Sequence, residues 1–563
     1  MKNQPDGGEA IVEAFRRLGV EYIVTSPGSE WSPVWEALTR QRVDARSGPQ
    51  FIQCWHETLA VNIATGYTMM TGRPQAVLLH AAAGMLQGAL GLFAATRAEV
   101  PLVVLSGESV TLGEDDARPM EGQWYAGVSV GGSDRLMAPL VKWSGRVHSA
   151  ITLYQSVIRA GEMAARTPKG VVHLDVPLEY MLADWTPPQA LSSVPPAPTR
   201  VALPADVHRL AERLVKASNP MIVAEHSGVD PRAFDALAQL AELLAIPVIG
   251  APGANFANFP QDNPLWLGVG AYQHLESSDL VLLAGGRTPW TPPSRRRTSG
   301  HIVAINDEPM KSWLIYQNLQ ADEYIEGDIA HTLTALAEAA ASVGFDSAAV
   351  EARRSTWSGV HRNVNAALQS EREAAARSDK LNVMAICDVV RELMRADAIY
   401  VEETVTHAIP LRKHLPLNRP QSFFRHNGGG LGQGIGIALG IKLAAPEQPV
   451  VLFAGDGSML YNPIVQAFGA AKQYDLPILI VVLNNQSYES MGRGHRLYYP
   501  DGVANSTDFG YGVKFDAPPF EDLGRPFDFF GACATSVAEF RTALAGAIEA
   551  LGEGRSAVIN AMV

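Results

Sequence analysis

Cysteine is scarce in this chain. Three cysteines occur among 563 residues, at positions 54, 387 and 533, and no two of them form a Cys-x-x-Cys pair. This spacing excludes a disulfide framework and a cysteine-based zinc motif, and it is typical of a protein from a reducing compartment. The sequence therefore predicts free thiols and a cytoplasmic location.

Positive charge and long apolar runs are also in short supply. Lysine and arginine together number 45 against 58 acidic residues, which gives a net charge of −13 and argues against nucleic acid or an anionic membrane as a partner. The first residues lack the apolar core of a signal peptide, and no apolar run is long enough to span a bilayer. A length of 563 residues exceeds one hydrophobic core and indicates about three domains.

The order of apolar and polar segments predicts an α/β protein with three doubly wound parallel-sheet domains. The first domain, residues 1–185, alternates short apolar strands with helical stretches and ends at a Pro-rich linker, 186–200. The second α/β domain, 201–345, leads into a helical, Ala-rich linker at 346–378. The third domain, 379–563, repeats the rhythm of the first.

The stretch 450–485 is the most informative part of the chain. An apolar run at 450–454 ends in Gly-Asp-Gly-Ser at 455–458, and a second apolar run at 478–483 ends in Asn-Asn. Two buried parallel strands joined by a helix open on the same edge of a sheet. That edge is where open α/β sheets bind ligands, so we expect the two strand ends to form one site.

The side chains at these strand ends are suited to a metal ion and a phosphate. Asp456 offers carboxylate oxygens and Asn485 an amide oxygen, while Gly455 and Gly457 allow backbone N–H groups to approach phosphates closely. Oxygen ligands beside a diphosphate suit Mg²⁺. The residues therefore predict a Mg²⁺-diphosphate site, with a nucleotide-site turn or a plain tight loop as the alternative for the motif alone.

Gly-Asp-Gly, a spacer of 26 residues (458–483) and Asn-Asn together resemble the thiamine diphosphate (ThDP) signature of the pyruvate-oxidase-like enzymes. That family includes acetolactate synthase, pyruvate decarboxylase and benzoylformate decarboxylase. The resemblance implies that Asp456 and Asn485 are side-chain metal ligands, that Ser487 adds a backbone or hydroxyl oxygen, and that Ser458 touches the diphosphate. Ordinary turn positions remain an alternative for both serines. Further cofactor contacts are implied for Gly455, Gly457, Met459, Asn485 and Tyr488.

The three α/β domains match, in order, the family's pyrimidine-binding, central and diphosphate-binding domains, so the resemblance covers nearly the whole chain. In this family the pyrimidine-binding domain of one subunit meets the diphosphate-binding domain of its partner. The resemblance therefore implies a homodimer or a homotetramer with the active site between subunits.

Glu57 lies in Cys-Trp-His-Glu at 54–57, just before a helical stretch that contains Gly66 and Tyr67. A carboxylate in the first turn of a helix is stabilised by the helix dipole, which is an ordinary structural role. Members of the family carry His-Glu followed by Gly-Tyr at this spacing, and the resemblance implies that Glu57 is the activating acid. Its carboxyl group would hydrogen-bond N1′ of the aminopyrimidine and promote formation of the thiazolium ylide, whose chemistry belongs to the cofactor.

A Gly-rich segment, His-Asn-Gly-Gly-Gly-Leu-Gly at 426–432, precedes a helical stretch. A loop before a helix is its plain interpretation. The resemblance implies that Gly429 accepts a hydrogen bond from the 4′-amino group and that Leu431 holds the cofactor in a bent shape. Because the residues that follow depart from the usual Gly-Leu-Pro-Ala-Ala, Ile435 is a second, weaker candidate for the latter role.

Ser29 and His80 bear on the substrate. Ser29 lies in Pro-Gly-Ser-Glu at 27–30, and His80 ends an apolar strand 23 residues after Glu57. Both segments resemble benzoylformate decarboxylase, which has Pro-Gly-Ser-Asn and His-Ser-Ala-Ala-Gly. The resemblance implies that Ser29 binds the substrate carboxylate and that His80 relays protons, while a structural histidine is the alternative.

Three further side chains are candidates near the substrate. The second active-site histidine of benzoylformate decarboxylase has no counterpart near 285–290, so His407 and His426 are candidates for acid–base work. Gln123 lies where carboligating members carry a cofactor-facing glutamine, and a solvated loop glutamine is equally compatible with its position.

Arg287 belongs to a Gly-x-Arg that also occurs in acetolactate synthases, which bind FAD. The residues that follow it lack the pattern of those enzymes. FAD is therefore an open alternative that the sequence does not favour.

Residues 492–525 form a long segment rich in aromatic residues, glycine and proline. Long segments of this kind in compact domains are usually functional. We expect this segment to cover the substrate side of the ThDP site or to contact another subunit.

The sequence as a whole predicts a ThDP- and Mg²⁺-dependent 2-oxo acid decarboxylase and/or carboligase that resembles benzoylformate decarboxylase. Its enamine intermediate would be protonated to an aldehyde or coupled to an aldehyde or ketone acceptor to give an acyloin. The alternatives are an acetolactate synthase-like acyloin synthase, a ThDP-dependent C–C hydrolase and a non-catalytic ThDP-fold protein.

Overall fold

The computed structural model describes most of the chain. The described residues are 4–111, 120–125, 131–189, 191, 193–286, 290, 292, 295–311, 321–378, 380–425, 430–507 and 511–563. They divide into two compact units. The first unit takes residues 1–198, 426–447 and 460–478, and the second takes 199–425, 448–459 and 479–563.

The first unit contains a six-stranded parallel sheet in the order β2-β1-β3-β4-β6-β5. Its strands are β1 (Tyr22–Thr25), β2 (Gln50–Gln53), β3 (Gln75–Leu79), β4 (Leu102–Glu108), β5 (Trp143–Arg146) and β6 (Val171–Pro177). Its helices are α1 (Gly7–Arg17), α2 (Ser32–Val43), α3 (Glu57–Thr71), α4 (Ala83–Arg97), α5 (Ser133–Met137), α6 (Leu153–Ala165) and α7 (Leu178–Leu182), with α14 (Gly434–Ala444) and α16 (Ile464–Gln473) from later in the chain. Strands β3, β4 and β6 are buried along their whole length, as expected for a sheet covered on both faces.

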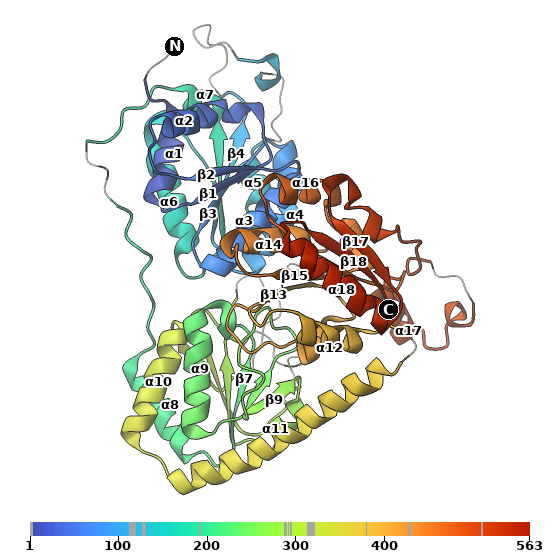
Figure 1. Cartoon of the computed structure of the whole chain (residues 1–563). Coiled ribbons are helices and arrows are strands. Elements are labelled where there is room, and N and C mark those ends of the chain that lie inside the picture. The colour runs from blue at the N-terminus through green and yellow to red at the C-terminus, as the bar shows by residue number, and fades with distance from the viewer. Residues whose placement is uncertain are drawn as a thin grey trace. The chain divides into compact units, whose positions relative to one another are not determined.

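Helix α3 is nearly all buried and lies beside α14, as Figure 1 shows with α14 in orange and α3 in blue. The two helices can approach closely because each presents glycine to the other. A Cβ atom on Gly66 would overlap the carbonyl oxygen of Ile437, and one on Gly440 would overlap the carbonyl oxygen of Ile63. Backbone therefore packs against backbone at this contact, which the absence of side chains on glycine permits.

The ends of α3 have recognisable caps. The ring nitrogen Nδ1 of His56 accepts a hydrogen bond from the backbone N–H of Thr58 at the N-terminus, which satisfies one of the free donors there. Gly72 ends the helix in the left-handed conformation, with φ of 70°. Glu57 is thereby fixed as the first residue of a rigid helix.

The second unit contains two six-stranded parallel sheets, in the orders β12-β11-β10-β7-β8-β9 and β14-β13-β15-β16-β18-β17. The strands of the first of these are β7 (Pro220–Ala224), β8 (Val248–Gly250), β9 (Trp266–Val269), β10 (Leu280–Ala284), β11 (His301–Asn306) and β12 (Glu323–Glu326). Those of the second are β13 (Ile399–Glu403), β14 (Phe423–Arg425), β15 (Val450–Gly455), β16 (Leu479–Asn484), β17 (Phe530–Ala534) and β18 (Ala557–Met562).

Helices cover both sheets of the second unit. They are α8 (Pro204–Lys216), α9 (Pro231–Leu244), α10 (Ile329–Val343), α11 (Ser347–Ala376), α12 (Val383–Leu393), α13 (Ala408–His414), α17 (Glu489–Tyr498) and α18 (Val537–Gly552). Figure 1 shows α8, α9 and α10 together beside the sheet that contains β7. The short helix α15 (Asp456–Tyr461) follows β15 directly. Its residues 456–459 are assigned to the second unit and 460–461 to the first.

Three parallel sheets with flanking helices confirm the predicted fold class. The exact domain boundaries given above stay a prediction. The three cysteines are free thiols, as expected. Within the described residues, no helix combines the length and the apolar character needed to cross a bilayer.

Candidate active site

Asp456 and Asn485 follow the carboxyl ends of two neighbouring strands in the second unit. Strand β15 pairs in parallel with β16, and Gly455 stands opposite Leu483 in the register. Asp456 Oδ2 accepts hydrogen bonds from the backbone N–H groups of Asn485 (3.0 Å) and Ser487 (3.3 Å). The predicted meeting of the two strand ends is therefore present.

The Asp456 carboxylate is 4% exposed and accepts its hydrogen bonds from backbone N–H groups, including that of Gly457 at 2.7 Å. Asn485 Oδ1 accepts a further bond from the N–H of Ser487 at 3.0 Å. The Asp456 carboxylate after β15 therefore lies beside the loop after β16 that carries Asn485 and Ser487. No cluster of three His, Cys, Asp or Glu side chains suited to a metal occurs in the described part of the chain. The donor set here is accordingly oxygen-rich and mixed, which suits a hard cation such as Mg²⁺.

Residues 513–515, from the segment 492–525, hold this loop in place through a pairing that sequence reasoning did not predict. The N–H of Tyr488 donates to the carbonyl of Val513 at 2.8 Å, and the N–H of Phe515 donates to the carbonyl of Gln486 at 3.3 Å. The Tyr488 and Phe515 rings lie 4.7 Å apart. A Cβ atom on Gly457 would overlap the Tyr488 ring, so glycine is required for this packing. The sequence carries no periodic signal for so short a pairing.

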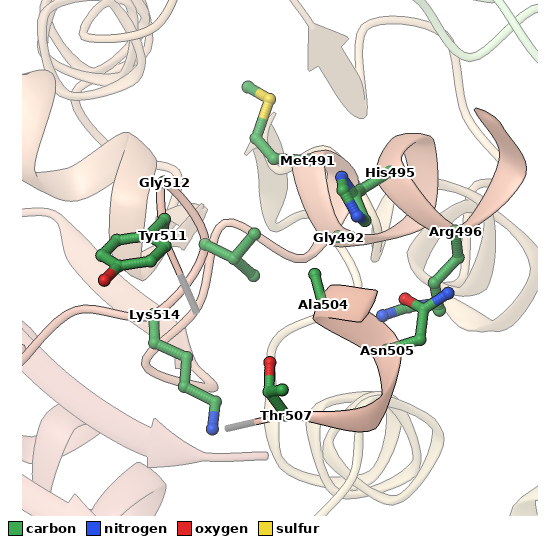
Figure 2. A pocket seen from close by; sticks show the side chains of 11 residues that line it. Met491, Gly492, His495, Arg496, Ala504, Asn505, Thr507, Tyr511, Gly512 and Lys514 are labelled. Atoms are coloured by element: carbon green, nitrogen blue, oxygen red, sulfur yellow. The ribbon is translucent and has the colours of Figure 1, made fainter. Parts of the chain in front are cut away.

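A cavity of about 550 Å³ opens beside this paired segment. Figure 2 shows His495 and Arg496 of α17 on one side of it, with Tyr511 and Lys514 across from them. Apart from Met491, its lining residues belong to the segment 492–525, which the sequence predicts to be a substrate cover or a subunit contact. That role stays a prediction.

In the first unit, Ser29 and His80 also follow neighbouring strands, β1 and β3. The Nε2 amide group of Gln123 donates to Ser29 Oγ at 3.2 Å. The His80 ring lies 6.0 Å from that of Trp124, in an edge-on arrangement. Three segments far apart in sequence, those of Ser29, His80 and the neighbours Gln123 and Trp124, therefore meet here.

Glu57 lies near this group, half-buried at the start of α3. Gly84, in the first turn of α4, separates it from His80. A Cβ atom on Gly84 would lie 2.9 Å from the Cβ of His80 and 3.4 Å from Oε1 of Glu57. The preceding Ala82 has φ of 42°, a left-handed value that costs energy for a non-glycine residue. The backbone thus accepts strain where the two side chains approach.

His80 is paired with Glu30, a fully buried acid that sequence reasoning did not single out. His80 Nδ1 lies 2.9 Å from each carboxylate oxygen. The hydrogen bond to Glu30 raises the pKa of His80, burial opposes this, and the negative charges of Glu30 and Glu57 add to the rise. The signal in the sequence that could have identified Glu30 is its position directly after Pro-Gly-Ser.

The remaining candidates lie elsewhere or outside the described residues. His407 precedes α13 in the second unit, and its Nε2 is buried without a hydrogen-bond partner among the residues described. Burial lowers the pKa of His407, the positive charge of Arg493 lowers it further, and Asp456 opposes both. His426, Gly429 and Arg287 lie outside the described residues.

The two candidates for the residue that bends the cofactor differ in exposure. Leu431 is half-buried, whereas Ile435 is fully buried within α14. The N–H of Ile435 donates to Oδ1 of Asn462 at 3.2 Å, which ties the start of α14 to the segment before α16.

Comparison with known proteins gives three family matches along the chain. Residues 5–123 match the N-terminal TPP binding domain of thiamine pyrophosphate enzymes, 207–336 their central domain and 403–561 their C-terminal TPP binding domain. Thiamine pyrophosphate (TPP) is another name for ThDP.

Individual relatives agree with these matches. Benzoylformate decarboxylase of Pseudomonas aeruginosa is 28% identical over 499 residues and covers 86% of each chain. Acetolactate synthase isozyme 3 large subunit of Escherichia coli is 24% identical over 575 residues, which cover 99% of this chain and 94% of that subunit.

Among solved structures, a 4-hydroxybenzoylformate decarboxylase from Rhodococcus jostii RHA1 superimposes with a TM-score of 0.80 at 23% identity and covers 99% of both chains. A benzoylformate decarboxylase from Polynucleobacter necessarius gives a TM-score of 0.79 at 20% identity and covers 99% of this chain and 98% of that one. At such identities the likeness shows a shared fold. With all three family domains matched in order, the predicted resemblance is confirmed: this chain belongs to the thiamine pyrophosphate enzymes.

Proposed function

We propose that this protein is a ThDP- and Mg²⁺-dependent enzyme that decarboxylates a small 2-oxo acid and releases an aldehyde. The single observation that carries the proposal is the set of side chains around His80 in a chain that belongs to this family. His80, whose pKa is raised, pairs with Glu30, and the hydroxyl of the adjacent Ser29 accepts a hydrogen bond from Gln123, an arrangement that suits carboxylate binding and proton donation. The similarity to benzoylformate decarboxylase supports the same activity.

Mg²⁺ is proposed to bind the oxygens of Asp456, Asn485 and Ser487. The buried Asp456 carboxylate supports this, because a buried negative charge requires compensation that backbone N–H groups supply only in part. Gly455, Gly457, Ser458, Met459 and Tyr488 are proposed to contact the diphosphate end of the cofactor.

When bound, ThDP supplies a carbanion for attack on a carbonyl carbon and a sink for the electrons released with CO₂. The chain's own groups are proposed to do the rest. Glu57 holds a proton at the pyrimidine nitrogen, and the Ser29 hydroxyl holds the substrate carboxylate. His80 donates a proton to the carbon that CO₂ has left, so that R–CO–COO⁻ and H⁺ become R–CHO and CO₂.

Carboligation is the second candidate activity. In that case an aldehyde or ketone takes the place of the proton, and an acyloin is formed. Gln123 favours it, because this amide lies beside Ser29 and could orient an acceptor carbonyl. The similarity to acetolactate synthases supports the same option. FAD is not part of either proposal.

The proposed active assembly is a homodimer or a homotetramer with the active site between subunits, in a cytoplasmic protein. The free cysteines and the family's use of two ThDP-binding domains support these proposals.

The proposed activity is tested with a panel of 2-oxo acids, with and without acceptor aldehydes, in the presence of ThDP and Mg²⁺. CO₂ release and the coupled product are measured together. We expect CO₂ release with aldehyde as the main product, and loss of this activity in Asp456→Ala. Asp235→Ala, an exposed acid on α9, is the matched control. Failure of every 2-oxo acid to release CO₂ would contradict the proposal.

A further inference from the structure

Glu30 is buried at 0% exposure in a short turn between β1 and α2. Its Oε1 accepts a hydrogen bond from the backbone N–H of Ala81 at 2.8 Å, and both oxygens lie 2.9 Å from Nδ1 of His80. A fully buried carboxylate without partners is strongly unfavourable, and His80 and the N–H of Ala81 supply the partners that Glu30 needs.

The surrounding backbone is shaped around this carboxyl group. A Cβ atom on Gly28 would overlap both the Glu30 carboxylate and Nδ1 of His80, and one on Gly107 would overlap the Glu30 side chain. The indole N–H of Trp31 donates to the carbonyl of Leu79 at 3.1 Å, which fixes the turn against the end of β3. Two glycines and an anchored tryptophan thus form a fitted space that holds the acid against the histidine.

This pairing determines which nitrogen of His80 carries a proton. An ionised carboxylate only accepts hydrogen bonds, so Nδ1 must be the donor. The neutral ring is then the Nδ1–H tautomer, and Nε2 is the nitrogen that gains or loses a proton.

We propose that Glu30 is a positioning residue of the decarboxylation proposed above: it fixes the His80 ring and its tautomer so that Nε2 is the atom that gives a proton to the product carbon. This inference rests on the proposed function.

The direction in which the surrounding charges shift the pKa of His80 is predictable. The titratable groups that face His80 are Glu30 from the turn after β1 and Glu57 from α3, and both are acidic, whereas Trp124 adds a neutral ring. Both carboxylates favour the imidazolium form, and they extend its pH range upward. A step that needs the imidazolium as acid loses rate as the pH rises through the pKa of His80.

The test uses Glu30→Gln, which keeps the size of the side chain and one acceptor oxygen but removes the charge. We expect the alkaline limb of kcat against pH to move to lower pH, and kcat at neutral pH to fall about tenfold, since general acids contribute about 10²–10⁴-fold. Retention of ThDP is expected to stay at the wild-type level. Adding Glu30→Gln to His80→Ala is expected to cause no further loss, because Glu30 acts through His80.

Two variants control for structure and charge. Glu13→Gln removes another buried carboxylate of the same unit, one that pairs with Arg16 and Arg17, and is expected to leave the pH profile unchanged. Glu30→Asp keeps the charge and is expected to keep the limb near the wild-type position.

A readout independent of turnover separates this inference from the proposed function. The His80 ring is titrated by NMR in protein with ¹³C-labelled histidine, and its signal is identified by its absence in His80→Ala. A lower pKa of His80 in Glu30→Gln supports the pairing even if no 2-oxo acid is turned over, in which case only the proposed function fails. Equal His80 titration in the two proteins, or superimposable pH profiles in an active enzyme, would overturn the inference.

Discussion

Two buried carboxylates show how the same chemical group is held in two ways. Asp456 accepts hydrogen bonds from the backbone N–H groups of its neighbour Gly457 and of Asn485 and Ser487 after β16, which hold its carboxylate at the ends of β15 and β16. Glu30 instead faces the ring of His80. The first arrangement suits binding of a cation, and the second suits control of a proton. Both residues lie in the segments that follow the carboxyl ends of parallel strands, Asp456 directly after β15 and Glu30 in the turn after β1.

Glu57→Gln is predicted to abolish proton exchange at C2 of ThDP while ThDP still binds. The amide keeps the size of the side chain but cannot share a proton with the pyrimidine nitrogen, so we expect a loss of about 10²–10⁴-fold in exchange rate. Deuterium exchange at C2, followed by NMR, measures the rate, and calorimetry measures the binding. Exchange at the wild-type rate would remove Glu57 from the mechanism.

At the level of single residues, sequence reasoning located Asp456 and Asn485 because both directly follow apolar runs, and the ends of adjacent parallel strands must meet. Glu30 was missed because burial of an acid depends on residues 50 or more positions away, here His80 and Gly107. No local pattern records such a partner. The pairing of Val513 with Tyr488 was not predicted for another reason: it is too short to produce a periodic pattern in the sequence.

Among the elements, the strand ends of the first unit carry a buried charge cluster that the proposed reaction does not use. Asp175, at the end of β6, is fully buried, and Arg146 lies 3.7 Å from it. Burial raises the pKa of Asp175 to about 8, the nearby Glu108 adds to the rise, and Arg146 opposes it. This carboxyl group is therefore mainly protonated in the folded protein at neutral pH.

Asp175→Asn is predicted to stabilise the protein at alkaline pH. A carboxyl group whose pKa is raised by folding binds more protons in the folded state, so its contribution to stability declines from about pH 4 to about pH 8. Asparagine does not ionise, so the variant does not lose stability in this way. We expect its Tm to be about 2 °C or more above that of the wild type at pH 8.5. Scanning calorimetry at pH 5 and pH 8.5 measures the difference. A variant whose relative stability is unaffected by pH would contradict the assignment.

Gly66→Ala is predicted to destabilise the contact between α3 and α14. The added methyl group would overlap the carbonyl oxygen of Ile437, and backbone cannot move aside as a flexible side chain can. We expect a loss of about 1–3 kcal/mol in the free energy of unfolding. Urea denaturation measures it, and Gly552→Ala, where a Cβ atom meets open space, is the control. Equal stability of both variants would show that the helices separate without cost.

On the scale of the whole molecule, the three parallel sheets were predictable from alternating strands and helices, whereas the two compact units were not. Helices α14 and α16 belong to the third domain by sequence, yet they pack with the first unit. Glycines such as Gly66 and Gly440 make this packing close. Glycine has no side chain, so the sequence pattern of an apolar helix does not show which of its faces makes such a contact. Sequence order therefore shows which elements form, but only weakly which surfaces meet.

Co-expression of Glu57→Gln and Asp456→Ala chains is predicted to restore activity that neither variant has alone. If the two residues serve one cofactor from different subunits, a mixed dimer contains one site with both residues intact. Random pairing then gives roughly a quarter of the wild-type activity per chain. The two chains carry different affinity tags, so that the mixed dimer is purified and assayed. A mixed dimer without activity would place both residues in one subunit.

The pairing of Tyr488 with Val513, and of Phe515 with Gln486, has a consequence for how this enzyme can diverge. Residues 486–488, beside the proposed metal ligands, are joined to residues 513–515 by backbone hydrogen bonds that do not depend on which side chains occupy those positions. Substitutions at 513–515 can therefore change how firmly this loop is held while the proposed ligands stay the same.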